Sequence, residues 1–166
     1  FTSASAAIWF PDAIAGKVLQ VVSTTKTDTF TTTSTSFTDI TGMSASITPS
    51  SSSSKILVIA TVSGSQTVGT NDNFLRLIRG STAISVGDTA GSRTPVTFQL
   101  MTGVANWTIT SAVIYLDSPA TTAATTYKLD CRVGSNTMYI NRSQNDTDSA
   151  GFPRTASTIT VMEISA

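Results

Sequence analysis

The sequence predicts an all-β fold, an antiparallel β-sandwich of jelly-roll-like form with about ten short strands. Two observations support this prediction. Apolar and β-branched segments of a strand's length recur about every ten residues, with turn residues between them. No apolar repeat with the helical period of 3.6 residues persists over two turns. No longer fixed-period repeat is present either, which argues against a solenoid or a propeller.

The first strand candidates lie close together. Lys17–Ser23 is a nearly continuous apolar run, which is typical of a strand buried on both faces. Thr29–Ile40 is rich in Thr and therefore favours an extended strand. Thr41-Gly42 predicts a turn, and Met43–Thr48 alternates between apolar and polar residues before a proline ends it.

The middle of the chain contains the strongest strand signal. Five serines, Ser50–Ser54, predict a flexible connector. Lys55–Val62 follows and is expected to lie mid-sheet in the core. Phe74–Arg79 has apolar and charged side chains on both faces. The remaining strand candidates are Thr82–Val86, Pro95–Met101, Trp107–Asp117, Tyr127–Val133, Met138–Asn141 and Thr158–Ile164.

The chain has one cysteine, Cys131, which excludes an intrachain disulfide. This residue alternates with Tyr127, Leu129 and Val133 along one predicted strand. The pattern favours a buried thiol, and an intermolecular bridge is the alternative.

The composition fits one domain with little charge. The chain has 166 residues, and its ten Lys and Arg balance its ten Asp and Glu. This zero net charge argues against nucleic acid or an anionic membrane surface as a partner, and it leaves little repulsion to oppose self-association. The longest apolar run, near Ile56–Val62, is too short for membrane insertion.

Residues 1–15 are expected to form an N-terminal arm or connector, and residues 16–166 the β-sandwich domain. The arm lies either across its own domain or between the domain and an upstream shaft. The residues expected to act in assembly are Ile8, Trp9 and Phe10. Because the sequence begins with Phe1, we expect a processed or partial product of a longer chain.

The residue types available make catalysis unexpected. The chain has no histidine, the commonest general base, and Glu163 is its only glutamate. A glycosidase needs two carboxylates that converge on one bond, and Asp146 with Asp148 is the nearest candidate pair. We therefore expect no enzyme, no catalytic residue and no cofactor.

Two loops, Asn71–Asn73 and Asn145–Asp148, are rich in side-chain oxygens. They suit calcium if backbone carbonyls complete the shell, but Asx turns are the favoured interpretation. No metal ligand is assigned. Five arginines can bind carboxylates of acidic sugars, or pair with aspartates on the surface or across a subunit seam: Arg76, Arg79, Arg93, Arg142 and Arg154.

Five segments of the chain resemble, in the same order, a domain of bacteriophage virion proteins. They are GKVLQVVSTTKTDTFTTTSTSFTDITG, ITPSSSSSKILVIATVSG, FLRLIRGSTAISVGD, LDSPATTAATTYKL and YINRSQNDTDSAGFPRTASTITVMEI. The resemblance spans about residues 16–164 and is strongest to the C-terminal module of tail fibres and related structural proteins of marine phages, including cyanophages. It implies a β-sandwich that forms a homotrimer in the virion, contacts other virion proteins and recognises a host-surface glycan or protein.

The resemblance assigns no binding residue, so the expected receptor contacts come from the polar loops. These are Gly64–Asn73, Gly87–Arg93, Gly134–Thr137 and Gln144–Phe152, and we expect them at one distal end. The candidate receptor-binding residues are Asn71, Asp72, Asn73, Asp88, Arg93, Asn136, Asn145, Asp146 and Asp148.

Two other functions remain open. Residues 1–15 lack the shaft or Gly repeat that often precedes fibre modules, which favours a head fibre, decoration or appendage-forming subunit without receptor binding. A carbohydrate-binding module of a larger depolymerase is the third possibility.

Overall fold

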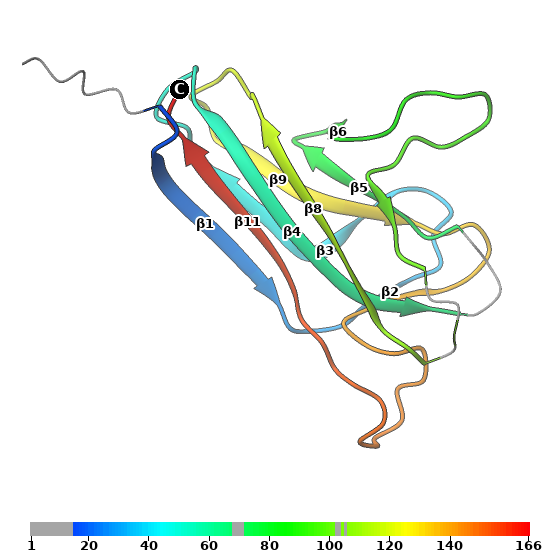
Figure 1. Ribbon diagram of the computed structural model, residues 1–166. Coiled ribbons are helices and arrows are strands. Elements are labelled where there is room, and N and C mark those ends of the chain that lie inside the picture. Colours follow the sequence, from blue (N-terminus) through cyan, green and yellow to red (C-terminus); the bar gives the residue numbers. More distant parts are fainter. Residues whose placement is uncertain (1–14, 68–71, 102–103, 105) are drawn as a thin grey trace, which may run out of the picture.

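The computed structural model describes residues 15–67, 72–101, 104 and 106–166. It is all-β, with eleven strands in two antiparallel sheets, as Figure 1 shows. The strands are β1 (Val18–Lys26), β2 (Phe30–Thr32), β3 (Thr38–Ile47), β4 (Lys55–Gln66), β5 (Phe74–Arg79), β6 (Thr82–Ile84), β7 (Phe98–Gln99), β8 (Ile109–Asp117), β9 (Thr125–Arg132), β10 (Met138–Ile140) and β11 (Ser157–Ile164). The expected all-β class with two antiparallel sheets is therefore confirmed.

The first sheet has the order β1-β11-β4-β10-β2, and β8 also pairs with β4. The segment Ile56–Thr61 of β4 pairs with both β11 and β8, so these two strands lie on its opposite edges. The second sheet has the order β3-β9-β5-β6, with β7 beside β5. In Figure 1 the second sheet lies behind the first, and β8 is the outermost strand of the first sheet next to β4.

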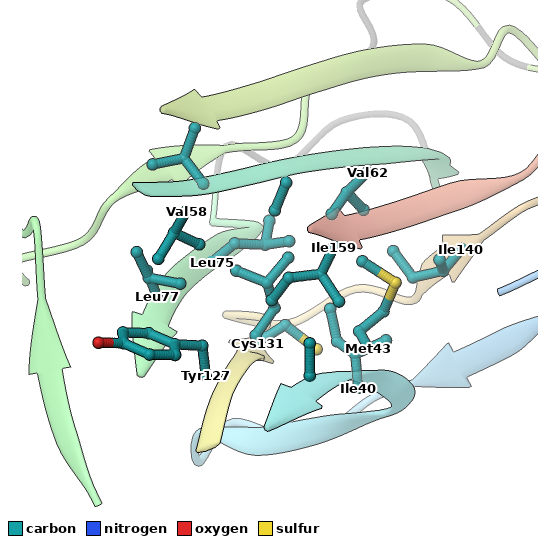
Figure 2. Packing of buried hydrophobic residues seen from close by; sticks show 14 of the residues in the cluster. Ile40, Met43, Val58, Val62, Leu75, Leu77, Tyr127, Cys131, Ile140 and Ile159 are labelled. Atoms are coloured by element: carbon teal, nitrogen blue, oxygen red, sulfur yellow. The ribbon is translucent and has the colours of Figure 1, made fainter. Parts of the chain in front are cut away.

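The core lies between the sheets and is built by alternation along each strand. In β4 the inward residues Ile56, Val58, Ala60 and Val62 are fully buried. Figure 2 shows Val58, Val62, Ile140 and Ile159 of the first sheet packed with Ile40, Met43, Leu75, Leu77, Tyr127 and Cys131 of the second. Lys55–Val62 is confirmed as a core strand, and β4 continues beyond it to Gln66.

The alternation predicted around Cys131 is confirmed, since Tyr127, Leu129, Cys131 and Val133 are all buried. Burial, followed by the nearby charges of Asp130 and Asp39, raises the pKa of the Cys131 thiol to about 12. The group is therefore a thiol at neutral pH, which suits a packing residue and not a reactive one.

The prediction of one continuous strand over Thr29–Ile40 is wrong, because residues 33–37 belong to no strand. The chain leaves β2 after Thr32 and resumes as β3 only at Thr38. Between them Ser34 N donates to Thr32 Oγ1 at 3.0 Å, and Ser34 Oγ donates to Ser36 O at 2.6 Å. Such local side-chain bonds compete with a sheet ladder, so hydroxyl-rich sequence forms a turn here despite its β propensity.

The turn predicted at Thr41-Gly42 is also wrong, because β3 runs through it with a register shift between Asp39 and Ser44. Gly42 has φ of 83°, a left-handed conformation that glycine adopts without a steric penalty. A β-bulge therefore replaces the turn.

The expectation that Ser50–Ser54 is a flexible connector is wrong for Ser50, which hydrogen bonds hold in place. Ser50 donates from N and from Oγ to Glu163 Oε1, at 2.7 and 2.6 Å. Gln20 Nε2 donates to the other carboxylate oxygen at 2.6 Å. Ser50 is therefore tied directly to β11 and, through Glu163, to β1.

The prediction that Lys17–Ser23 is buried on both faces is wrong for the single chain. The strand lies at the edge of the first sheet, and its outward residues Val18, Leu19 and Val21 are exposed. Among the residues that the structure describes, only one side of this strand has a partner layer.

Candidate functional site

One end of the sandwich gathers several connections between strands. β4 ends at Gln66, β8 begins opposite Gly64, and β9 ends at Arg132, opposite the start of β5. Thr67 N donates to Thr137 O at 3.0 Å, which joins the β4–β5 and β9–β10 connections. We call the described residues 72–73, 104, 106–108, 133–137 and 141–156 the loop end.

The longest connection of the loop end, residues 141–156, contains three of the expected site residues. A hollow of about 240 Å³ there is lined by Asp146, Thr147, Asp148, Ser149, Phe152 and Arg154. Asn145 Oδ1 accepts hydrogen bonds from Thr147 N at 3.2 Å and from Thr147 Oγ1 at 2.6 Å. Asn145 therefore forms the expected Asx turn, and its own N donates to Asn106 Oδ1 at 3.0 Å.

Asp146 fixes the shape of this hollow. Its carboxylate pairs with Arg154 Nη2 at 2.7 Å and with Arg142 Nη1 at 3.4 Å. The Arg142 guanidinium also lies 4.3 Å from the ring centre of Tyr139 in β10. Asp148 is exposed beside this group and is free to face a ligand.

A second part of the loop end holds Asp72, Asn73 and Asn136. Asp72 lies directly against Gly134, where a Cβ would come within 2.0 Å of Asp72 Oδ2. Asn73 and Asn136 are buried, and Asn73 Nδ2 donates to Gln66 Oε1. Neither asparagine therefore offers its side chain to solvent.

Two candidate residues lie elsewhere. Asp88 and Arg93 are exposed on the β6–β7 connection, where Gly87 N donates to Val96 O at 3.2 Å. Figure 1 shows this connection extending from the edge of the second sheet, away from residues 141–156. The four expected loops are therefore not all gathered at one end. Asn71, Ile8, Trp9 and Phe10 lie outside the described residues.

Most arginines pair with aspartates of the same chain. Arg76 Nη2 lies 2.5 Å from Asp130, and Arg79 Nη1 lies 2.9 Å from Asp117. Tyr127 OH also donates to Asp117, at 2.7 Å. Burial, followed by this hydrogen bond, raises the pKa of Tyr127. These arginines are structural within the chain.

Sequence reasoning missed one hollow. It has a volume of about 340 Å³ and is lined by Arg79, Gly80, Pro119, Thr121, Ala124, Thr125 and Thr126. It lies at the opposite end of the sandwich, between the β5–β6 hairpin and the β8–β9 connection. No sequence motif joins these two segments, so only the fold brings them together.

Within the part of the chain that the structure describes, no three His, Cys, Asp or Glu residues gather as a metal site. No helix long and apolar enough to cross a membrane occurs in those same residues. Comparisons with known proteins give no match, neither to a protein-family model nor to a curated protein.

Proposed function

We propose that this chain is a structural protein of a bacteriophage virion and forms the receptor-binding tip of a tail fibre. In this role it is not an enzyme, and it attaches the virion to a glycan or protein on the host surface. The proposal rests on the resemblance in residues 16–164. The observation that carries the binding role is the exposed, hydroxyl- and carboxylate-lined hollow of residues 146–154.

The geometry of that hollow favours recognition of polar groups. Thr147, Asp148 and Ser149 are exposed and offer hydroxyl and carboxylate groups for hydrogen bonds. The ion pairs of Asp146 hold the loop in one shape, which lowers the ordering cost of binding. In a homotrimer, three weak sites of this kind would sum to firm attachment.

The alternative is a head fibre, decoration or appendage-forming subunit without receptor binding. It is favoured by exposed apolar residues on the first sheet, among them Val21, Ile114 and Leu116, because such residues suit assembly. For this alternative, deleting residues 1–15 should abolish incorporation into the virion while the domain stays folded. Binding of the isolated chain to cells would contradict it.

A matched pair of variants tests the receptor-binding role. Asp148→Ala removes an exposed carboxylate from the hollow, and Asp88→Ala removes one from the β6–β7 connection. We expect Asp148→Ala to weaken binding of the labelled full chain to a panel of marine bacteria by about tenfold, the loss of one charge-assisted hydrogen bond. Asp88→Ala should bind as the wild type does.

Two results would contradict the proposal. The first is a wild-type chain that binds no strain of the panel. The second is equal cell binding by wild type, Asp148→Ala and a variant in which residues 146–149 are all alanine.

A further inference from the structure

The outer faces of the two sheets differ in charge. On the second sheet, Arg76 pairs with Asp130 between β5 and β9, and Lys128 Nζ lies 2.7 Å from Asp39. Within the described ranges of the chain, the outer face of the first sheet has no such ladder. This asymmetry indicates that only the second sheet is built to face water on its own.

The register of the first sheet aligns its outward side chains in rows across β1, β11, β4 and β8. The first row is Val21, Met162, Leu57 and Leu116; the second is Ser23, Thr160, Ile59 and Ile114; the third is Thr25, Thr158, Thr61 and Ala112. None of these side chains is charged. Lys55, which donates to Ser118 Oγ at 2.7 Å, borders the rows at one end.

Six apolar side chains of these rows form what we call the apolar stripe: Val21, Leu57, Ile59, Ile114, Leu116 and Met162. Three of them are largely open, with exposed fractions of 55% for Val21, 70% for Ile114 and 53% for Leu116. The others are half-buried between their neighbours. A contiguous apolar surface of this kind is unusual on the water-facing side of a sheet.

The sequence pattern indicates a cover for this face. Lys17–Ser23 and Lys55–Val62 are apolar at successive positions, the pattern of strands buried on both sides. The chain's own second sheet covers only the inner side of β1 and β4. A partner on the outer side would give both strands the environment that their residues fit.

We propose that the apolar stripe packs against the same stripe of other copies of this chain, with the outer faces of the first sheets turned toward one another. Two identical uncharged faces meet without repulsion, whereas a charged partner gains nothing from this surface. This inference rests on the proposed function in one respect, since a fibre tip works as an assembly of identical copies.

The hydroxyl groups of the same face also permit its burial. Ser23 Oγ and Thr160 Oγ1 lie 2.8 Å apart, and Thr61 Oγ1 and Thr158 Oγ1 lie 2.9 Å apart. In each pair one hydroxyl donates to the other, so one of the two donors is already satisfied across the strands. A second copy therefore excludes water from these rows at a lower polar cost than if the hydroxyls were unpaired.

The size of the face fits the centre of such an interface. The four strands lie about 4.8 Å apart and the three rows about 6.8 Å apart, which gives this face a flat area of roughly 400 Å². A stable interface buries about 800 Å² on each partner, so a rim around the stripe completes the contact.

The test is the solution mass of the full chain by light scattering, with a matched pair of variants. Ile114→Thr with Leu116→Thr removes apolar contacts but keeps good strand formers. Met101→Thr with Val104→Thr makes the same kind of change at exposed residues outside the stripe. We expect a multimer of 17.3 kDa units for wild type and for Met101→Thr with Val104→Thr. The stripe variant should show a dissociation constant raised about 100-fold.

A further variant of the stripe is needed in case Ile114→Thr with Leu116→Thr fails to fold. Val21→Thr changes the stripe at its other side, in β1, and should raise the dissociation constant about tenfold. A wild-type mass of 17.3 kDa overturns the proposal, and so does an unchanged mass for the two stripe variants. A chain lacking residues 1–14 that is monomeric, while the stripe variants stay assembled, would identify the arm as the contact and overturn it too.

Cell binding separates this inference from the proposed function. A monomeric wild-type chain that still binds cells would leave the receptor role intact and refute the stripe. A chain that assembles through the stripe but binds no bacterium would refute the receptor role and leave the stripe intact.

Discussion

Glu163 is the only glutamate of the chain, and its side chain is fully buried in β11. Burial by itself raises the pKa of this carboxyl, but hydrogen bonds from Ser50 and Gln20 outweigh it and hold the pKa at about 2. The residue therefore joins three segments as a carboxylate: β1, the serine run before β4, and β11. Sequence inspection found the glutamate but had no means of identifying its partners.

The lowered pKa of Glu163 predicts a loss of stability in acid. The unfolded carboxyl has a pKa near 4.5, so its stabilising contribution is complete above that pH and disappears as the pH falls through about 2. We expect the free energy of unfolding of wild type to fall across this window more steeply than that of Glu163→Gln. Urea unfolding at several pH values measures the difference, and parallel curves for the two proteins would contradict it.

At the scale of the strand, Gly64 permits the close approach of β4 and β10. A Cβ on this residue would lie 2.3 Å from Tyr139 O and 2.9 Å from Leu100 Cδ2. The carbonyl belongs to the backbone of a paired strand, so it cannot move away as a flexible side chain would. Glycine is therefore required here by packing and not by a turn, although the sequence suggests a loop beginning at this residue.

We expect Gly64→Ala to lower the free energy of unfolding by about 1–3 kcal/mol, because the strands must shift to accept the methyl group. Gly151→Ala is the matched control, since a Cβ at that position meets no atom within 4 Å. Thermal unfolding followed by circular dichroism compares the two variants. Equal melting temperatures for both would show that β4 and β10 are not as tightly paired as described.

The connections between strands show where sequence reasoning reached its limit. The strand Phe74–Arg79 was predicted with the bounds it has, because alternation is a local property. The break between β2 and β3 was not predicted, because local hydroxyl bonds there outweigh the β propensity of threonine. Strand pairing determines the end of the sandwich at which a loop lies. The sequence alone therefore did not predict that Asp88 and Arg93 lie away from residues 141–156.

For the whole molecule, the uncharged stripe predicts an assembly that is insensitive to salt. Screening weakens contacts between charges, and none of the stripe residues has one. We expect the light-scattering mass of the wild-type chain to stay constant between about 0.05 M and about 0.5 M sodium chloride. Dissociation at the higher concentration would assign the contact to ion pairs instead, such as those of the second sheet.

The all-β class, the inward positions of the Tyr127–Val133 strand and the shortage of acid–base groups follow from the sequence alone. These properties depend on residue type and on a period of two, both of which are local. The folded arrangement was needed to see which loops share an end, which aspartate pairs with which arginine, and which side of β1 and β4 stays open. Those outcomes depend on pairing between segments far apart in the chain, such as β1 with β11, and local patterns do not encode it.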